Sequence, residues 1–572
     1  MNELWYWQPA HQEITLGSLF YNKEKLCFLV GSGISCNPPT CFPTGYQFTK
    51  KLLQYVLPLE VQRDILALMD PEREGMRSSG DFLRFERLLV YIQESCDPAL
   101  QVLDDFGAGT PNPLHEFLAQ MIVQGSPVFT TNFDTLIENA LLATGIPRKK
   151  VFPVIHKTDW ETKFEPDQYR VYKLHGSIFD VHWQMHSRES LKATLAQIAQ
   201  GKGTLFRLEP WKRQVLEFYL RSYDLLVLGY SGLDDFDVLP TLWDIESTKR
   251  ILWITHDSNR SPDQARIEIV DYKEPKSRPA ETLKVDRAGK NLLKFIRYQA
   301  RKPSQLIRIY VNTGQLVDWL SEQVLDEHPR PKRIISDNGG EFSFPSFLKI
   351  SGFEQWLLAA EIFEGCHVLN QSLEAYATAL GMLPIGSGKE KQLMVLIFNS
   401  MGRIFHREKD HKSALENYQT AYKIAANLGS LKLKSQSLNN IGRLFCDQDC
   451  FEEALETYKQ AFSLVEETTD DLGKSTILNN IGQCLFEIGE LDGALDYYRQ
   501  SIVIADQLGN LKGMIAALNN IAMIFRRKSL LDESLRYYRQ ALQAARLTGY
   551  LEEEEVILSN ISSILQEQGA IG

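Results

Sequence analysis

The strongest constraint on the fold is a tetrapeptide that returns every 40 residues in the C-terminal part of the chain. It reads "NSMG" at 399–402, "NNIG" at 439–442 and 479–482, "NNIA" at 519–522 and "SNIS" at 559–562. Three further columns repeat with it, holding a small residue, a tyrosine and a second small residue: Ala414, Ala454, Ala494 and Ser534; Tyr418, Tyr458, Tyr498 and Tyr538; Ala421, Ala461, Ser501 and Ala541. A fixed period of this length predicts stacked helical units that share a continuous core.

This order of small and aromatic columns resembles the tetratricopeptide repeat, in a longer form of 40 residues. The small residues let two helices approach closely, and the tyrosine fills the space beside them. The resemblance covers four full copies, a degenerate leading copy at 372–380 and a trailing helix. It implies an all-α solenoid over residues 351–572 whose concave face binds another protein or a peptide. A scaffold that packs only against its own chain or a second copy is the alternative.

Residues 1–320 follow a different pattern, in which short apolar runs alternate with helical stretches. The runs are "LCFLV" (26–30), "PVFT" (127–130), "VYKL" (171–174), "LLVLGY" (225–230), "ILWIT" (251–255) and "IRIYV" (307–311). Continuous apolar strands are typical of a parallel sheet that is covered on both faces. They end at GSG, TNFD, HGS, YSG, THD and NTG, and ligands bind beyond the carboxyl ends of such strands. We expect an α/β domain here, and a linker at 321–350, where prolines, Gly-Gly and mixed charge interrupt any period.

The composition of the 572-residue chain excludes several classes of protein. Its net charge of −11 argues against a general nucleic-acid-binding protein. Its eight cysteines are scattered and include no CxxC pair, so neither a disulfide framework nor a four-cysteine zinc site is expected. No apolar run approaches the roughly 20 residues that span a bilayer, and no export signal is visible at the N-terminus. We therefore expect a cytoplasmic protein without membrane contact.

Gly31-Ser32-Gly33 ends the first apolar run and allows two interpretations. Glycines at the end of a strand permit close approach of a ligand to the backbone, and a following helix offers free N–H groups to a phosphate. The alternative is a tight turn that binds nothing. These residues alone do not favour either interpretation.

Four further segments follow this turn: "PNPLHEFLA" (111–119), "TNFD" (131–134), "LHGS" (174–177) and "GYS" (229–231). With "GSGIS" at 31–35, their order resembles the sirtuin family. Its members carry a Gly-Ala-Gly-Ile-Ser turn, a Pro-Asn-x-x-His helix, a Gln-Asn-Ile-Asp-like tetrad, a Leu-His-Gly turn and a Gly-x-Ser turn. The resemblance covers roughly residues 20–320. It implies a Rossmann-like parallel sheet that binds NAD.

The chain also departs from the sirtuin deacylases. It lacks their zinc module of two CxxC pairs and their Pro-Asp-Phe-Arg string, and Thr131 replaces the glutamine of the tetrad. These departures argue against an acyl-lysine channel but do not argue against an NAD pocket. What remains looks like the zinc-free sirtuin-like domains of bacterial anti-phage defence proteins, which hydrolyse NAD. In that group the asparagine of the tetrad and the histidine of Leu-His-Gly are essential, and the matching residues here are Asn132 and His175.

The chemistry of NAD cleavage suits these two side chains. The nicotinamide–ribose bond breaks through an oxocarbenium-like cation, and the leaving group is a neutral heterocycle that needs no acid. A neutral imidazole such as His175 can accept a proton or orient the ribose hydroxyls. The amide of Asn132 both donates and accepts, so it can fix a water and a hydroxyl together. Asp134 either stabilises the cation or, as we slightly favour, caps the helix that follows.

The remaining candidates come from position in these turns. The predicted NAD-binding residues are Gly31, Ser32, Gly33, Ile34, Asp134, Gly229, Ser231 and Asn312. Thr313 lies beside Asn312, and His115 is expected to be structural because it falls inside an amphipathic helix. Asp234, Asp235 and Asp237 form a solvated acidic turn or, less favoured, a metal cluster; no metal is expected.

These inferences predict an NAD glycohydrolase effector of abortive anti-phage defence. NAD is its substrate, and the repeats sense a protein or peptide trigger, for example a phage component, or control assembly into a homo-oligomer. Two alternatives remain: a sensor that binds NAD or ADP-ribose without turnover, and a protein deacylase or ADP-ribosyltransferase.

Overall fold

The computed structural model divides the chain into two compact units, which we call the sheet unit and the helical unit. The sheet unit comprises Met1–Val56, Leu83–Lys202 and Phe206–Lys349, and the helical unit comprises Leu57–Phe82, Gly203–Leu205 and Ile350–Gly572. The structure describes residues 7–9, 14–20, 25–69, 88–89, 91–93, 97, 99–107, 109–161, 167–187, 189–191, 208–230, 238, 241–242, 245, 249–270, 305–324, 350–384, 388–508, 510–548 and 551–571. Ser231, the acidic turn at 234–237 and most of the predicted linker lie outside these residues.

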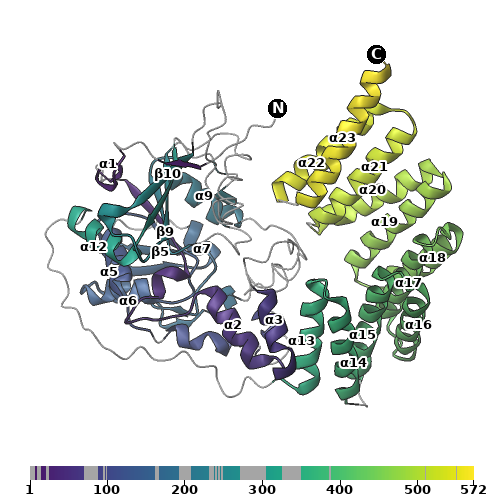
Figure 1. Cartoon of the computed structure of the whole chain (residues 1–572), viewed down its shortest axis with the longest axis horizontal. Helices are drawn as coiled ribbons and strands as arrows, with labels where there is room; N and C mark the ends of the chain where they lie inside the picture. The colour runs from purple at the N-terminus through teal and green to yellow at the C-terminus, as the bar shows by residue number, and fades with distance from the viewer. Residues whose placement is uncertain are drawn as a thin grey trace. The chain divides into compact units, whose positions relative to one another are not determined.

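A sheet forms the centre of the sheet unit (Figure 1). It has nine strands in the spatial order β1-β10-β11-β9-β8-β2-β3-β5-β4. The strands are β1 (Trp7–Pro9), β2 (Leu26–Val30), β3 (Val128–Thr130), β4 (Val151–Val154), β5 (Tyr169–Lys173), β8 (Asp224–Leu228), β9 (Arg250–His256), β10 (Arg266–Val270) and β11 (Gln305–Val311). The run from β11 to β4 is parallel, while β10 and β1 pair antiparallel at one edge. A separate hairpin joins β6 (Phe179–Asp180) and β7 (Met185–His186).

The chain order of the parallel strands reverses at β2. After β2 the chain adds β3, β4 and β5 on one side of it, and then crosses to add β8, β9 and β11 on the other. Such a switch point opens a crevice at the carboxyl ends of the strands. The ends of β2, β3, β5 and β8 therefore meet at this edge, where the sequence places the GSG, TNFD, HGS and GYS turns.

Helices cover both faces of the sheet. Alternate residues of each strand point to opposite faces, so each parallel strand contributes to two hydrophobic cores. Leu26, Phe28 and Val30 of β2 pack in one core with α5 (Pro113–Val123), α6 (Leu136–Ala143) and α12 (Thr313–Val324). Cys27 and Leu29 pack in a second core with α7 (Lys157–Glu161) and α9 (Pro210–Leu220). Further helices in the described part of this unit are α1 (Leu16–Leu19), α2 (Gly45–Val56) and the short 3-10 turns η1 (Ser32–Ser35), η3 (Gln101–Gly107), η4 (Arg148–Lys150) and η5 (Pro262–Gln264).

All six apolar runs that the sequence predicted as strands are strands, and the predicted parallel α/β arrangement is confirmed. Sequence reasoning missed β1, β4 and β10. Strand β4 contains Pro153 and β10 alternates charged and apolar residues, so neither resembles a doubly covered strand. Both features are typical of strands near a sheet edge, where one face of the strand or one row of its backbone hydrogen-bonding groups is exposed to solvent.

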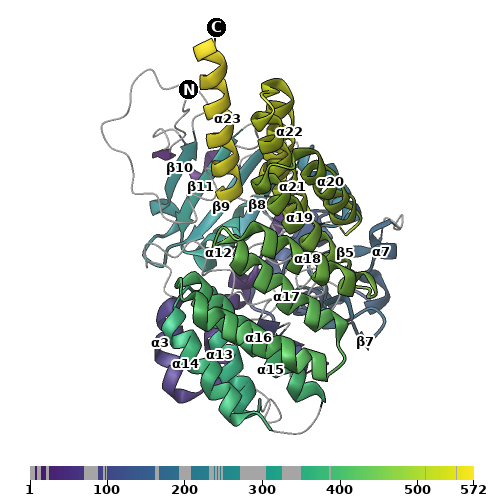
Figure 2. The ribbon, with the colours of Figure 1, turned by 90° about the vertical axis from the view of Figure 1, so that its right-hand side faces the viewer.

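The helical unit consists of antiparallel helix pairs that stack in chain order (Figure 2). The helices are α3 (Leu59–Leu68), α13 (Gly352–Gly365), α14 (Leu369–Met382), α15 (Gly388–Arg407), α16 (His411–Asn427), α17 (Leu431–Cys446), α18 (Phe451–Glu466), α19 (Asp471–Ile488), α20 (Leu491–Gln507), α21 (Leu511–Arg527), α22 (Leu531–Thr548) and α23 (Leu551–Ile571). The all-α solenoid with a leading copy and a trailing helix is thus confirmed. Among the described residues, no helix is both long and apolar enough to cross a membrane.

The repeated columns form the core of each pair as predicted. A Cβ atom on Gly442 would lie 2.8 Å from the ring of Tyr458, and one on Gly402 would lie 2.5 Å from the ring of Tyr418. The tyrosines are buried, with exposed fractions of 2% or less. The small residue is therefore required because the tyrosine of the partner helix occupies the space of a side chain.

Asparagines of the repeated tetrapeptide join consecutive copies. Nδ2 of Asn480 donates to Oδ1 of Asn439 at 2.9 Å, and the same contact recurs from Asn440 to Asn399, from Asn520 to Asn479 and from Asn560 to Asn519. The helical unit also takes in α3, which comes from the N-terminal half of the sequence. Nε2 of Gln371 in α14 donates to Oδ2 of Asp64 in α3 at 2.8 Å.

Candidate active site

The turns after β2 and β8 are packed directly against each other. The Gly31 N–H donates to the Leu228 carbonyl at 3.1 Å, and the Gly33 N–H donates to the Gly229 carbonyl at 2.8 Å. A Cβ atom on Gly33 would lie 2.8 Å from Cα of Gly229, and one on Gly229 would lie 2.5 Å from the Ile34 nitrogen. Gly229 also has a φ of +62°, which favours glycine.

This packing bears on the interpretation in which the glycine turn offers its N–H groups to a phosphate. The amides of Gly31 and Gly33 already donate within the protein, so they are not free for a phosphate. The helix that follows, η1, is a 3-10 turn of four residues, and the next helix begins only at Gly45. The glycines are explained by the contact between two turns. A role of Gly31, Ser32, Gly33, Ile34 and Gly229 in NAD binding stays a prediction.

Ser35, the last residue of η1, is the centre of a buried polar network. Its hydroxyl donates to Oδ2 of Asp134 at 3.2 Å. The same oxygen accepts from Nδ2 of Asn132 at 3.3 Å and lies 3.1 Å from Nε2 of His115. A hydroxyl offers one donor and two acceptor positions, so these three contacts satisfy it completely.

The tautomer of His115 follows from its two contacts. The backbone N–H of Asn112 donates to Nδ1 at 3.1 Å, so the ring proton is on Nε2 and donates to Ser35. The ring is fully buried, and this burial lowers its pKa from 6.5 to about 4, against an opposing effect of the nearby Asp134 carboxylate. His115 is thus neutral and fixed, consistent with the structural role that the sequence predicted.

Asn112 joins the Pro-Asn-x-x-His helix to the glycine turn. Its side-chain oxygen accepts from the N–H groups of Leu114 and His115 at the start of α5. Its amide nitrogen donates to the carbonyls of Ile34 at 2.8 Å and Asn37 at 3.2 Å. One side chain therefore caps α5 and fixes the loop that carries Ser35.

Asn132 lies beyond the carboxyl end of β3. Its side-chain amide nitrogen is hydrogen-bonded, whereas its amide oxygen accepts no hydrogen bond from the described residues. The residue is 7% exposed, and Nδ2 is held by Ser35. Oδ1 is buried and has no hydrogen-bond partner among the described residues. A buried acceptor without a partner is costly, about 1–3 kcal/mol, unless a ligand or water supplies a donor. The orientation imposed by Ser35 thus leaves an acceptor for a hydroxyl.

His175 occupies the equivalent place beyond the neighbouring strand. Thr130 of β3 pairs with Lys173 of β5, so Asn132 and His175 each lie two residues past the last paired position. The two turns are also joined directly, because the Ile178 N–H donates to the Phe133 carbonyl at 3.1 Å. His175 is 7% exposed, and the centroid of its imidazole lies 6.5 Å from that of the Phe133 ring. The structure therefore brings the two predicted catalytic residues to adjacent turns of one edge.

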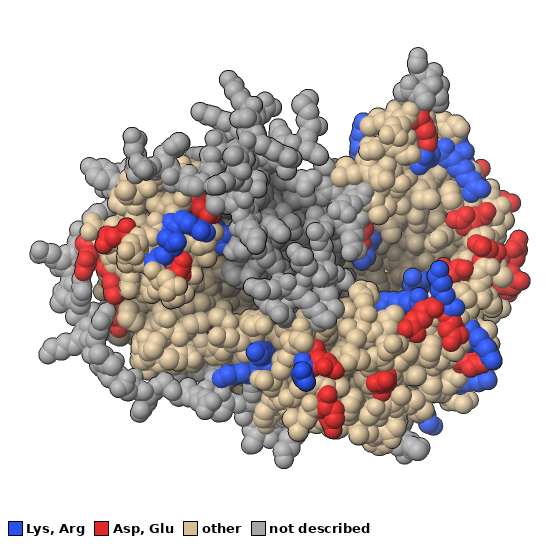
Figure 3. Space-filling view, in the orientation of Figure 1, with Lys and Arg blue, Asp and Glu red and all other residues tan. Residues whose placement is uncertain are grey.

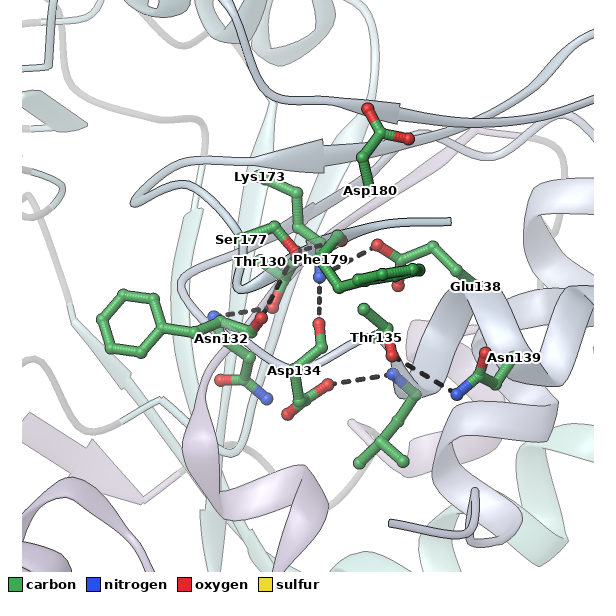
Figure 4. A network of polar contacts seen from close by, with 12 residues as sticks. Thr130, Asn132, Asp134, Thr135, Glu138, Asn139, Lys173, Ser177, Phe179 and Asp180 are labelled. Carbon is green, nitrogen blue, oxygen red and sulfur yellow. Dashed lines mark hydrogen bonds and ion pairs between the residues drawn. The ribbon is translucent and has the colours of Figure 1, made fainter. Parts of the chain in front are cut away.

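Asp134 uses both carboxylate oxygens within the protein. Oδ2 accepts from Ser35, and Oδ1 accepts from the Leu136 N–H at 3.1 Å in the first turn of α6. This second contact is the helix-capping role favoured from the sequence. Its carbonyl oxygen accepts from Nζ of Lys173, whose ammonium lies 3.0 Å from Oε1 of Glu138 (Figure 4).

The Lys173–Glu138 ion pair is buried, with side-chain exposed fractions of 1% and 0%. Burial raises the pKa of the Glu138 carboxyl, and the ammonium of Lys173 opposes this rise. A second lysine acts in the same way on the other turn, since Nζ of Lys212 donates to the Leu174 carbonyl at 2.6 Å and pairs with Glu209. Two paired ammonium groups therefore fix the backbones that precede His175 and follow Asn132.

The remaining predicted residues lie farther along the edge. Asn312 follows β11, and its Oδ1 accepts from the Gln315 N–H at 3.2 Å, which caps α12. Thr313 contacts Nδ1 of His256 at 3.0 Å. Strands β9 and β8 separate β11 from β2, so Asn312 is not brought to the Asn132 turn by the sheet. In the described part of the chain, no cluster of three His, Cys, Asp or Glu side chains is arranged to hold a metal.

Sequence reasoning missed Ser35, Asn112, Lys173 and Lys212 as parts of the site. A signal existed for three of them. Ser35 and Asn112 belong to the quoted segments GSGIS and PNPLHEFLA, and Lys173 is a charged residue in an otherwise apolar strand. Lys212 lies in an amphipathic helix, where a lysine is ordinary, so nothing in the sequence marked it.

A Rossmann-like parallel sheet with polar turns at its switch point, followed by a repeat solenoid, defines the class of protein. Comparison with known families agrees with it. The SIR2-like domain matches residues 126–271, and the tetratricopeptide repeat matches residues 433–507 and 514–548. The chain thus contains a region that matches a SIR2-like domain, followed by a region that matches tetratricopeptide repeats, as its motifs predicted. None of the curated proteins matches the chain.

Several solved structures resemble part of the chain. BtubC (BKLC) from P. vanneervenii is 17% identical, with a TM-score of 0.28 over 38% of this chain and 80% of its own. Aspartyl phosphate phosphatase F from Bacillus subtilis is 18% identical, with a TM-score of 0.33 over 38% of this chain and 60% of its own. A signal transduction ATPase with a tetratricopeptide repeat sensor from Pyrococcus horikoshii is 11% identical, with a TM-score of 0.33 over 38% and 35%.

Proposed function

We propose that the chain is an NAD glycohydrolase that cleaves NAD to nicotinamide and ADP-ribose. The observation that supports this most directly is the buried Oδ1 of Asn132 at the carboxyl edge of the sheet, to which none of the described residues donates a hydrogen bond. A ribose hydroxyl or a water supplies such a donor. The SIR2-like match at residues 126–271 makes NAD the ligand whose chemistry fits best.

Three side chains divide the work in this proposal. Ser35 holds Nδ2 of Asn132, so that Oδ1 accepts from a ribose hydroxyl or from the attacking water. His175, on the adjacent turn, accepts the proton that this water loses when it attacks the ribose carbon. Asp134, whose two oxygens are engaged, is a positioning residue that fixes Ser35 and the start of α6.

We further propose that the helical unit restrains this activity and releases it on contact with a protein or peptide trigger. An enzyme that destroys a central cofactor must be inactive at rest. A ligand that binds one conformation of the repeats better than another supplies the required shift in population. Basic and acidic side chains are interspersed on the face of the helical unit in Figure 3, which suits a protein ligand. Anti-phage defence, a cytoplasmic location and homo-oligomer formation belong to the same proposal.

The test is an NAD-consumption assay in bacteria that express the full chain, with and without phage infection. We expect infected cells to lose NAD and accumulate nicotinamide and ADP-ribose in equal amounts. Asn132→Ala and His175→Ala should lower the rate at least about 100-fold, since each removes a group that acts in the transition state. His186→Ala, which changes an exposed histidine of β7, is the matched control and should retain the rate.

Full turnover in both Asn132→Ala and His175→Ala would overturn the assignment. Labelled NAD separates the alternatives in the same cells. Label retained on protein, or an acylated ADP-ribose product, indicates transfer or deacylation. Tight binding of NAD by calorimetry, with no turnover in infected lysate, indicates a sensor.

A further inference from the structure

Two cysteines of consecutive repeats are in contact inside the helical unit. Cys446 is the last residue of α17, and Cys484 lies in α19, the corresponding helix of the next repeat. Their Sγ atoms are 3.0 Å apart. Cys484 is fully buried, whereas Cys446 is only partly buried and therefore accessible to a small reagent.

The repeat itself shows that this pair is a departure from the pattern. The column of Cys484 otherwise holds buried aliphatic residues, and these are Ile404, Leu444, Ile524 and Ile564. The column of Cys446 otherwise holds larger polar or aromatic residues, and these are His406, Phe486, Arg526 and Gln566. Packing in the other copies is thus achieved without sulfur, and only between α17 and α19 do both columns of a contacting pair hold a thiol.

The surroundings give the two thiols different reactivity. The hydrogen bond from Cys484, together with one from Tyr458, lowers the pKa of the Cys446 thiol, although its partial burial opposes this. The hydrogen bond to Cys446 and burial raise the pKa of the Cys484 thiol. Cys446 is therefore the thiol of this pair that loses its proton more readily. A partly exposed thiol of lowered pKa in contact with a second thiol is the arrangement of a nucleophilic and a resolving cysteine.

We propose that Cys446 and Cys484 form a reversible disulfide that links consecutive repeats under oxidising conditions. The Cys446 thiolate attacks one oxygen of a peroxide, the O–O bond breaks, and hydroxide leaves, so that a sulfenic acid forms at Cys446. The sulfur of Cys484 then attacks this sulfur, its proton goes to the leaving hydroxide, and water is released. Two thiols and one hydrogen peroxide thus give one disulfide and two waters, and an external dithiol reverses the reaction.

The link would act on the shape of the repeat array. It joins α17 to α19 across α18, so it fixes the spacing of two neighbouring helices of the solenoid. Since the curvature of a solenoid is set by small rotations between repeats, oxidation would hold one curvature. This modification site is independent of the proposed NAD chemistry.

The test is graded oxidation of the purified full chain with hydrogen peroxide. Free thiols are alkylated, and the digest is analysed without reduction by mass spectrometry. We expect a cross-linked peptide pair containing Cys446 and Cys484, lighter by about 2 Da than the sum of the free peptides and lost on treatment with dithiothreitol. Cys450, which is partly exposed and lies only four residues from Cys446, is the internal control and should stay alkylatable at peroxide doses that complete the link.

Two variants test the separate roles that the proposal gives to Cys484 and Cys450. Cys484→Ile restores the residue that three other copies carry, so packing is retained while the resolving thiol is lost. In this variant the sulfenic acid at Cys446 should persist and be trapped by dimedone, whereas the wild-type chain should give little adduct. Cys450→Ser should cross-link as the wild type does. The proposal is overturned if Cys446 and Cys484 remain alkylatable after Cys450 is oxidised, or if Cys484→Ile gives no dimedone adduct.

Discussion

His115 makes the sheet unit sensitive to acid, and the size of the effect follows from its environment. Its ring is buried and neutral, and its Nε2–H is needed by Ser35. The pKa is lowered from 6.5 to about 4, so between these values the unfolded chain binds a proton that the folded chain does not. Unfolding free energy therefore falls as the pH is lowered through this window, and the loss is complete below the folded pKa.

The magnitude can be worked from the two pKa values. Between pH 7 and pH 5 this one group removes about 2 kcal/mol from the unfolding free energy of the sheet unit. His115→Gln abolishes the titration and can keep both contacts, because a glutamine oxygen accepts from the Asn112 N–H and its amide nitrogen donates to Ser35. We expect the pH-dependent loss to be smaller by about 2 kcal/mol in His115→Gln than in the wild type.

The assay is urea unfolding of the full chain at pH 7 and pH 5, followed by pulsed hydrogen exchange in peptides that cover residues 112–136. Such peptides report the network itself and not the helical unit. His186→Gln changes an exposed histidine and should leave the wild-type pH dependence in place. Equal pH dependence in the wild type and His115→Gln would refute the reasoning, since the histidine would then not be held neutral by its burial.

Two further predictions concern groups that fix the site turns. Lys173→Met leaves the buried Glu138 without its cation and should cost about 3–5 kcal/mol at neutral pH, and adding Glu138→Leu should recover most of it in urea melts. A loss in the double variant as large as in the single one would contradict this account. Gly229→Ala places a Cβ atom 2.5 Å from the Ile34 nitrogen at a positive φ and should cost about 2 kcal/mol or more. Gly125→Ala has a φ of +91° but no atom within 4 Å of its Cβ, so it should cost less; equal unfolding free energies for the two variants would mean that the turns do not need their close contact.

The parts of the fold that the sequence predicted are those encoded by local pattern. Six apolar runs became strands because residues buried on both faces of a sheet are continuously apolar. The helix pairs followed from a period of 40 residues, since every copy must present the same small and aromatic residues to its neighbour. Strand β4 was missed because Pro153 interrupts its short apolar run, and proline is typical of strands at the edge of a sheet.

The candidate site was predicted less completely, because its contacts join residues far apart in the chain. Asn132 and His175 could be selected as members of short segments whose order resembles a family. That Ser35 holds Asn132, 97 positions further along the chain, could not be read from either segment. Nor could the sequence show that the amides of Gly31 and Gly33 are consumed by the turn after β8.

The sequence by itself determined the class of each unit, because strand burial, helix periodicity and repeat columns are properties of neighbouring residues. Only the tertiary structure decided what the polar groups do. It set the tautomer of His115, the unused oxygen of Asn132 and the buried cations behind both turns. It also brought Cys446 and Cys484 into contact from two repeats. The physical reason is that a buried polar atom must find its partner in space, and Ser35 for Asn132 and Glu138 for Lys173 come from distant parts of the chain.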